Sequence, residues 1–246
     1  MTDQRPGQRP YQLFVESFKG EVVSADDALQ LAEKLAADVA QWLQRGVDQR
    51  GAATLVVSGG STPAPFFSSL SQHEIAWSEV TVTLADERWV DSNNDISNEK
   101  LVRETLLINA ASDAKFTSLF VGTDSPQNGW PVCEQGLQSL SRPFDVVVLG
   151  MGGDGHTASL FPNTDGLSDA CDLSTDKLCW PMYPNHLDEA RMTLTLKALL
   201  DCRELVLHMT GVNKRDVFNR ALQGEDFPIG TVAKAAEDKL QVYWTA

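Results

Sequence analysis

The sequence of 246 residues predicts an α/β fold, namely a doubly wound, mostly parallel sheet with helices on both faces. Two observations lead to this prediction. Short apolar runs rich in β-branched residues alternate with longer segments of helical periodicity, and several of these runs end directly in a glycine-rich or charged turn. Because neither a repeat nor a long Pro/Gly/Ser linker divides the chain, we expect a single domain over residues 1–246.

The individual elements follow from the local pattern. A first helix of about five turns is expected from Ser24, because Ser24 and Asp27 are spaced like a capping box. Residues 162–190 are rich in Asp, Asn and Pro, so they are expected to form a long loop that covers one end of the sheet as a lid. Strands are predicted over 53–57, 80–85, 118–121, 144–149, 192–196, 204–209 and 240–244, and further helices over 97–107 and 213–222.

The charge of the chain excludes some classes of partner. With a formal net charge of −14, the protein repels both a nucleic-acid backbone and an anionic membrane surface, and no run of Lys or Arg provides a local exception. We therefore expect neither nucleic acid nor membrane as a partner. An acidic protein that binds a small anion must also gather its few cations in one place.

The cysteines and the N-terminal segment indicate the compartment. The chain has four cysteines, with no CxxC pair and no nearby histidine at the spacing of metal ligands. We expect reduced thiols that serve mostly in packing. The N-terminal segment lacks the apolar region of a signal peptide, and no stretch approaches the roughly 18 apolar residues that a membrane helix needs. These patterns predict a cytoplasmic protein.

The first candidate cluster is the sequence SGGSTP at residues 58–63, between a predicted strand and a predicted helix. Ligands of open parallel sheets bind beyond the carboxyl ends of the strands. Gly59 and Gly60 allow the backbone to approach a ligand closely, and the amides together with the hydroxyls of Ser61 and Thr62 suit a phosphate. A tight strand-to-helix turn with a hydroxyl cap explains the same residues equally well.

The second cluster is a group of three charged residues, Asp86, Glu87 and Arg88, directly after the next predicted strand. Charged residues at this position are hard to explain as a solvated face. The guanidinium of Arg88 suits a phosphate or carboxylate, while Asp86 and Glu87 are candidates for orienting it or for transferring protons. A structural ion pair at the strand end is the alternative, although the position and the clustering favour a functional role.

The third cluster begins where the predicted strand at 144–149 runs into four glycines within residues 150–155. This unusual backbone path brings Asp154 and His156 together at the edge of the sheet. Histidine titrates near neutral pH, and a carboxylate two residues away fixes its tautomer and raises its basicity. These residues therefore predict a general base, His156, that is oriented by Asp154.

Other motifs argue against several enzyme classes. Three of these glycines also match GxGxxG, but they lie past the middle of the chain and precede GHTASLFP, which does not look like the opening of a helix. The motifs GxxxxGK[ST], HExxH and GxSxG do not occur, so the sequence does not favour a P-loop NTPase, a zinc protease or a serine hydrolase. We expect no cofactor and no catalytic metal.

Taken together, these motifs resemble the family of 6-phosphogluconolactonases and glucosamine-6-phosphate isomerases/deaminases. The resemblance implies a Rossmann-like fold and the hydrolysis of 6-phospho-D-glucono-1,5-lactone to 6-phospho-D-gluconate, the second step of the oxidative pentose phosphate pathway. It spans nearly the whole chain in the expected order, with SGGSTP at 58–63, DERWV at 86–90, SN at 97–98, LGMGGDGHTASLFP at 149–162, RMTLT at 191–195 and TGVNK at 210–214.

The resemblance also implies roles for individual residues. His156 is the general base, the SGGST loop with Arg191 and Lys214 contacts the phosphate, and Arg88 is a further anion contact. On this interpretation His156 takes a proton from the water that attacks the lactone carbonyl, and the ring oxygen leaves as an alcohol. Amides of the glycine-rich loops or Arg88 stabilise the oxyanion. Asp86 is counted among the catalytic candidates, with its role left open.

Two alternatives have different signatures. The related deaminases follow their histidine with an acidic residue in an FNEP-like segment and have a DEY-like sequence earlier, whereas this chain has TASLFP at 157–162 and DERW at 86–89. Both departures favour lactone hydrolysis. A non-catalytic sugar-phosphate-binding module of a transcription regulator normally carries a basic recognition helix, and the 52 residues before the first predicted strand offer none. No pattern in the sequence specifies the oligomeric state.

Overall fold

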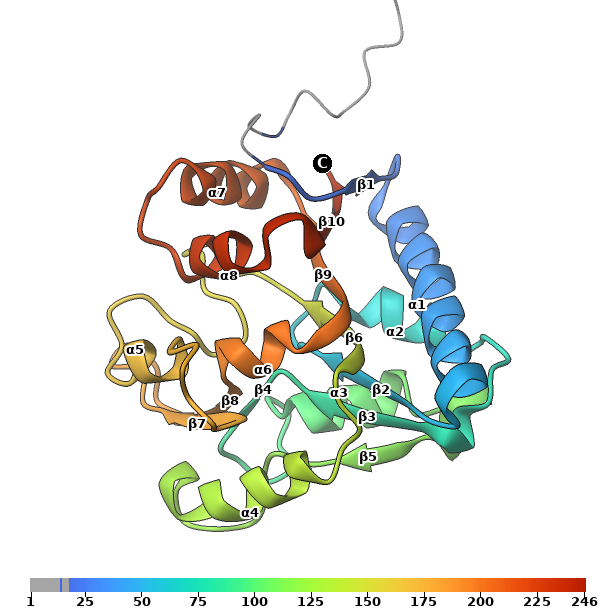
Figure 1. Ribbon diagram of the computed structural model, residues 1–246, viewed down its shortest axis with the longest axis horizontal. Helices are drawn as coiled ribbons and strands as arrows, with labels where there is room; N and C mark the ends of the chain where they lie inside the picture. The colour runs from blue at the N-terminus through green and yellow to red at the C-terminus, as the bar shows by residue number, and fades with distance from the viewer. Residues whose placement is uncertain (1–13, 15–17) are drawn as a thin grey trace, which may run out of the picture.

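A seven-stranded parallel sheet forms the centre of the computed structural model, which describes Phe14 and residues 18–246 (Figure 1). Its strand order is β1-β10-β9-β6-β2-β3-β5, and every neighbouring pair is parallel. The strands are β1 (Val22–Ser24), β2 (Ala53–Val57), β3 (Val80–Leu84), β5 (Lys115–Thr117), β6 (Phe144–Leu149), β9 (Cys202–Thr210) and β10 (Leu240–Thr245). This arrangement confirms the predicted doubly wound, mostly parallel sheet.

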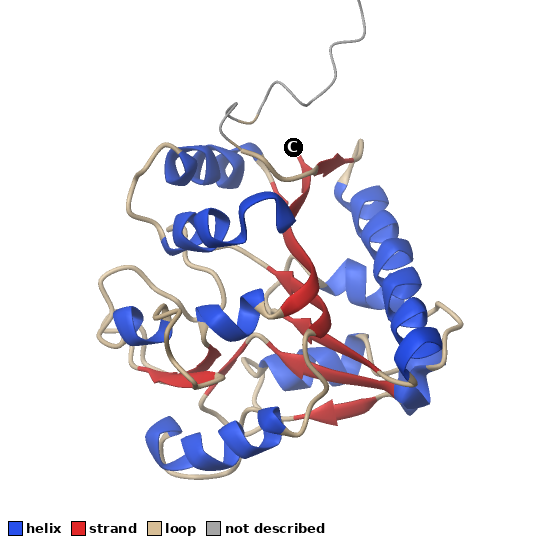
Figure 2. Ribbon diagram, viewed as in Figure 1, coloured by secondary structure: helices blue, strands red, loops and turns tan. Residues whose placement is uncertain are grey.

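Helices cover both faces of this sheet, with α1 on one side and α6 and α8 on the other (Figures 1 and 2). The helices are α1 (Ala28–Arg50), α2 (Ala64–Leu70), α3 (Asn98–Thr105), α4 (Pro126–Gln138), α5 (Leu167–Ala170), α6 (Leu196–Leu200), α7 (Val212–Leu222) and α8 (Pro228–Ala236). Short 3₁₀ turns occupy Trp77–Glu79, Asn109–Asp113 and Glu237–Lys239.

The first helix starts later than the sequence pattern predicts. Asp27 is its N-cap, and the Asp27 side chain accepts a hydrogen bond from the amide of Gln30 at 2.9 Å. Ser24 instead ends β1, which pairs with β10. The predicted capping box that starts at Ser24 is therefore wrong, because the parallel pairing keeps Ser24 extended.

A second, antiparallel sheet was not predicted. It consists of β4 (Asp86–Arg88), β8 (Arg191–Leu194) and β7 (Cys179–Met182), in the order β4-β8-β7. Segment 162–190 is therefore not one long loop, since it contains both α5 and β7. The carboxylate of Glu134 on α4 anchors the start of β7, because it accepts a hydrogen bond from the amide of Leu178 at 3.0 Å.

Two predicted strands have different limits in the structure. Residues 118–121 are a turn after β5, and the Ser118 hydroxyl donates to the carbonyl of Phe120 at 2.8 Å within it. The strand predicted over 192–196 ends at Leu194, because Thr195 caps α6 by accepting a hydrogen bond from the amide of Ala198 at 3.2 Å. In both cases a hydroxyl bonds to the backbone and ends the extended run.

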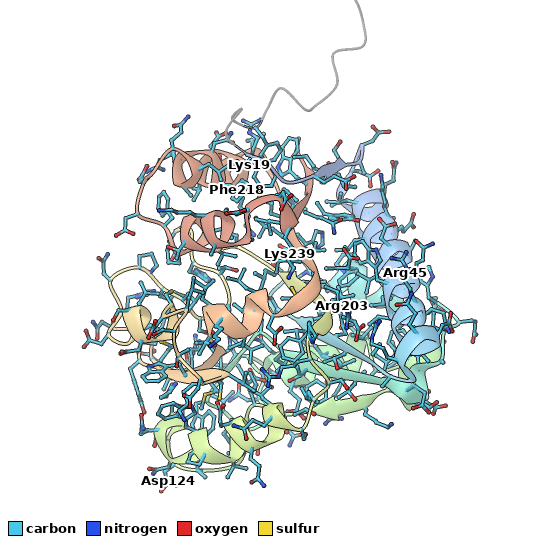
Figure 3. All side chains as sticks on the ribbon, in the orientation of Figure 1. Lys19, Arg45, Asp124, Arg203, Phe218 and Lys239 are labelled. Atoms are coloured by element: carbon cyan, nitrogen blue, oxygen red, sulfur yellow. The ribbon has the colours of Figure 1, made fainter. Side chains whose placement is uncertain are left out.

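The core is one continuous cluster of buried apolar side chains that reaches from the parallel sheet into β7 and β8. Phe218 lies inside it, whereas Arg45 and Asp124 lie on the outside of the molecule (Figure 3). Within the described residues, no helix combines the length and the apolar character needed to cross a membrane.

Candidate active site

The candidate site lies where the winding of the parallel sheet reverses. From β2 the chain adds β3 and β5 on one side, and then it returns through β6 to add β9 and β10 on the other. The turns after β2 and β6 are therefore neighbours, and the amide of Ser58 donates to the carbonyl of Val148 at 3.0 Å. Such a reversal leaves a crevice at the carboxyl ends of the strands, where ligands of this fold class bind.

A cavity of about 200 Å³ opens at this crevice. It brings together loop, strand and helix residues that are far apart in the sequence, including most of the predicted site. Its lining is formed by residues 58–63, Phe67, Asp86, Arg88, Asn98, residues 148–152, His156, Ala158, His208 and Lys214. The predicted residues Gly59, Gly60, Ser61, Thr62, Asp86, Arg88, His156 and Lys214 are all among them.

A second hollow of about 390 Å³ adjoins the cavity and shares Asp86, Arg88, His156 and Ala158 with it. Its remaining lining includes Asp154 and Arg191. Lys214 lines the cavity, whereas Arg191 lines the second hollow. The two cations that the resemblance assigns to the phosphate therefore line adjoining hollows that share four residues.

The pair formed by His156 and Asp154 has the geometry of an oriented base. The ring nitrogen Nδ1 of His156 lies 2.6 Å from Oδ1 of Asp154, and the amide of His156 donates to the same oxygen at 3.2 Å. Burial raises the pKa of the Asp154 carboxyl, but the charge and the hydrogen bonds of His156 outweigh it and leave this pKa lowered. With Nδ1 held by the carboxylate, Nε2 is the nitrogen that remains to accept a proton.

The glycine-rich turn before His156 is shaped around the imidazole. A Cβ atom on Gly152 would lie 2.3 Å from both Cε1 and Nδ1 of His156, closer than any side chain permits. The amide of Gly152 also donates to the carbonyl of His156 at 2.9 Å, so the turn closes on itself. Only glycine at position 152 lets the ring turn back over its own loop.

Arg88 and Asp86 are held in place by Asn98, at the start of α3. The Nδ2 of Asn98 donates to the carbonyl of Asp86 at 2.8 Å, and its Oδ1 accepts a hydrogen bond from Nη1 of Arg88. The same Nη1 donates to the carbonyl of Ile96 at 2.9 Å. A Cβ atom on Gly59 would lie 1.8 Å from Oδ1 of Asn98, so Asn98 also packs against the first glycine-rich turn.

Asp86 and Glu87 are the two carboxylates whose roles the sequence left open. Their surroundings in the structure differ. Asp86 lines the cavity, and its Oδ2 accepts a hydrogen bond from the hydroxyl of Ser159 at 2.6 Å. Glu87 is fully buried and accepts hydrogen bonds from the amides of Asn98 and Glu99 at 2.8 and 2.7 Å. Burial raises the pKa of Glu87, while these hydrogen bonds oppose that change. Glu87 therefore joins β4 to α3 and has a structural role.

The site concentrates positive charge in an acidic protein. Among the described residues, neither Arg88 nor Lys214 forms a salt bridge, although the chain has a formal net charge of −14. Burial lowers the pKa of Lys214. The pKa of Arg191 is lowered by burial and then by the charge of Arg88, which lies opposite it across β4 and β8. Cations without carboxylate partners are suited to bind an anionic ligand.

Sequence reasoning missed three polar residues that line the cavity, namely Asn98, His208 and the side chain of Ser58. His208 is 3% exposed and Ser58 is 8% exposed, and both Nε2 of His208 and Oγ of Ser58 lack a hydrogen-bond partner among the described residues. A buried polar group left unpaired costs about 1–3 kcal/mol. The apolar run around His208 suggested a core strand and gave no sign of a site, whereas Asn98 belongs to the SN segment that the resemblance includes.

Comparisons with known proteins find relatives that match most of the chain. The family model described as glucosamine-6-phosphate isomerases/6-phosphogluconolactonase matches residues 26–244. A protein of Rhizobium meliloti (strain 1021) named 6-phosphogluconolactonase is 43% identical over 217 residues, which cover 87% of this chain and 94% of that protein. A Pseudomonas aeruginosa protein of the same name is 39% identical, with 88% and 91% covered.

A solved structure is also similar to this chain over most of its length. The crystal structure of a 6-phosphogluconolactonase from Shewanella baltica OS155 has a TM-score of 0.89 to this chain at 43% identity, with 92% of this chain and 98% of that chain covered. The residues matched by the family model, 26–244, include both glycine-rich turns. The chain therefore belongs to the family of glucosamine-6-phosphate isomerases and 6-phosphogluconolactonases.

Proposed function

We propose that this protein is a 6-phosphogluconolactonase, which hydrolyses 6-phospho-D-glucono-1,5-lactone to 6-phospho-D-gluconate. The observation that carries the proposal is the contact of 2.6 Å between His156 and Asp154 at a cavity that also holds the unpaired Lys214. An oriented base and a cation in one cavity suit a substrate with an electrophilic carbonyl and a phosphate. The named relatives support this assignment over a binding module.

In the proposed mechanism, Nε2 of His156 accepts a proton from a water molecule as the water oxygen attacks the lactone carbonyl carbon. The tetrahedral intermediate then collapses, the bond between the carbonyl carbon and the ring oxygen breaks, and the ring oxygen takes the proton from the imidazolium. The resulting carboxylic acid loses its proton to solvent. Asp154 keeps the imidazole oriented and stabilises its cationic form between the two proton transfers.

Most of the other predicted residues are assigned to phosphate binding. Among the described residues, the amides of Gly59, Gly60, Ser61 and Thr62 donate to no protein acceptor, so they are available to a phosphate together with Lys214. Arg88 lines both hollows, which supports a role in stabilising the oxyanion. The phosphate contact of Arg191 remains a proposal from the family resemblance, and it requires the substrate to reach the second hollow.

A cytoplasmic location is part of the proposal. All four cysteines are free thiols, and three of them are buried. Burial raises the pKa of Cys133 and of Cys202 to about 12. Thiols that stay protonated and inaccessible fit a reducing compartment, in which disulfides are rare.

The direct test measures hydrolysis of freshly generated 6-phosphoglucono-δ-lactone by the purified protein, with the spontaneous rate subtracted and with and without a chelator. We expect turnover well above background in both conditions. Ammonia release from glucosamine 6-phosphate, measured in parallel, is expected to be absent, because residues 157–162 contain no carboxylate. Lactone hydrolysis at the spontaneous rate would contradict the proposal, and ammonia release would identify a deaminase instead.

A further inference from the structure

Two of the residues that line the cavity each carry a buried polar atom without a hydrogen-bond partner among the described residues. Only three buried side-chain nitrogen or oxygen atoms lack a hydrogen-bond partner among the described residues, and two of these, Nε2 of His208 and Oγ of Ser58, belong to residues that line the cavity. The third, Nε1 of Trp130, belongs to a residue that does not line it. Unpaired groups gathered at one cavity point to a ligand that completes their hydrogen bonds.

Packing alone does not require a histidine at position 208. The residue lies on β9 between apolar neighbours, and its ring meets the edge of Phe66 with centroids 6.2 Å apart. An apolar side chain would fill this space and leave no nitrogen unpaired. The unpaired nitrogen of His208 therefore destabilises the free protein. A bound ligand that supplies the missing hydrogen-bond partner would remove this penalty.

The surroundings of His208 select the kind of ligand. The cavity contains the unpaired cation Lys214 and the loop amides of residues 59–62, which donate to no acceptor among the described residues. Burial and then the charge of Lys214 lower the pKa of His208 to about 4, so the ring is neutral at pH 7. A neutral imidazole adds a donor without placing a second cation beside Lys214. This collection of donors suits an anion with several acceptor oxygens, as in a phosphate monoester.

We infer that His208 is a specificity-determining residue that donates a hydrogen bond to the phosphate end of the substrate, with Ser58 as a second donor. The inference rests on the proposed function for the identity of the substrate. The hydrogen bonds themselves concern the phosphate group, so they can be tested without turnover. The two donors favour a phosphorylated sugar lactone over the same lactone without its phosphate.

The experiment measures the affinity of inorganic phosphate and of 6-phosphogluconate by calorimetry for the wild type, His208→Leu, His208→Gln and Ser58→Ala. We expect His208→Leu to weaken both affinities roughly 10- to 100-fold, as for the loss of a hydrogen bond to a charged group. His208→Gln, whose amide nitrogen lies near the place of Nε2, recovers part of the affinity. Ser58→Ala is expected to weaken both affinities less than His208→Leu does. His73→Leu replaces a histidine outside the cavity and is expected to bind like the wild type.

Activity provides a second readout. The ratio of kcat/KM for 6-phosphoglucono-δ-lactone to that for glucono-δ-lactone is expected to fall in His208→Leu, mainly through KM. Unchanged phosphate affinity in folded His208→Leu and Ser58→Ala would overturn the inference, and a lower Tm in these variants would then indicate a structural role. If His208→Leu does not fold, the affinities of Ser58→Ala and His208→Gln for inorganic phosphate and 6-phosphogluconate test the inference in its place. Phosphate binding that depends on His208 in a protein without lactonase activity would contradict only the proposed function.

Discussion

The two glycine-rich turns at the centre of the site follow neighbouring parallel strands, yet they differ in how many of their backbone amides are bonded within the turn. The turn at 58–63 leaves the amides of residues 59–62 without an acceptor among the described residues. In the turn at 150–156, the amides of Gly152 and Gly155 bond to the carbonyls of His156 and Gly152, at 2.9 and 3.1 Å. The first turn keeps these donors for a ligand, whereas the second uses the amides of Gly152, Gly155 and His156 to fix one imidazole.

This difference separates binding from catalysis. A binding loop gains from donors that are unpaired until the ligand arrives, while a base must be held in its productive orientation before the substrate arrives. We therefore expect substitutions in the second turn to act mainly on kcat and substitutions around the first turn to act mainly on KM.

Among substitutions that leave the proposed base itself in place, the largest effect is expected from Gly152→Ala. The new methyl group would overlap the His156 ring, where the built Cβ position is 2.3 Å from Nδ1, so the imidazole must leave its orientation against Asp154. We expect kcat to fall roughly 100-fold or more, as for the loss of a positioned base. Gly153→Ala is the matched control, because its Cβ would meet no described atom within 4 Å. Equal kcat values in the two variants would show that the orientation of His156 is not limiting.

A smaller effect, on KM, is expected from Lys214→Ala. The variant removes one of the two cations of the cavity that form no salt bridge among the described residues, and we expect KM for the phosphorylated lactone to rise roughly 10- to 100-fold, with a much smaller change in kcat. Lys34→Ala removes an exposed lysine of α1 and serves as the control. Steady-state kinetics at two ionic strengths check the prediction, since the wild type should lose affinity with salt and Lys214→Ala should lose less. A fall in kcat alone would assign Lys214 to the chemical step.

Asn98→Ala is expected to act across both regions, because Asn98 contacts Arg88, the backbone of Asp86 and Gly59. Without its Oδ1, Nη1 of Arg88 keeps only the carbonyl of Ile96 as a partner. We expect kcat/KM to fall roughly 10-fold, as for the loss of one hydrogen bond to a charged group. Asn98→Asp keeps an acceptor oxygen for Nη1 of Arg88 but loses the Nδ2 donor to the carbonyl of Asp86, so it should restore part of the activity that Asn98→Ala loses. No difference between the two variants would contradict this role of the amide oxygen.

The smallest effect concerns stability at low pH. The pKa of Asp154 is lowered in the folded protein, so the pair with His156 stabilises the fold above about pH 4, the usual value of a free aspartate, and this contribution is lost as pH falls through the lowered pKa. Urea unfolding of the wild type and Asp154→Asn at pH 6 and at pH 3 checks this. We expect the wild type to have the larger free energy of unfolding at pH 6, and the difference between the two proteins to be smaller at pH 3. A difference that stays constant with pH would mean that the carboxylate charge does not contribute.

The same two turns show what the sequence reveals. The strands that lead into them, predicted over 53–57 and 144–149, coincide with β2 and β6, because a buried parallel strand is a local apolar run that pattern recognition finds. His156 and Asp154 were found because their contact is local, only two residues apart.

Features that depend on tertiary neighbours were not predictable. The second sheet pairs β4 with β8, about a hundred residues later, and β4 consists of three charged residues that carry no strand signal. Asn98 and His208 gain their positions from the crevice and not from their sequence neighbours. Arg191 and Lys214 likewise line adjoining hollows from two different elements, β8 and α7.

The most direct test of the central claim, that the second turn exists to hold a general base, is the turnover of 6-phosphoglucono-δ-lactone by His156→Ala, with the spontaneous rate subtracted and folding confirmed by circular dichroism. The account predicts a fall in kcat of roughly 10²- to 10⁴-fold with KM nearly unchanged, while His73→Ala behaves like the wild type. A folded His156→Ala that keeps near-normal kcat would contradict the assignment of the base.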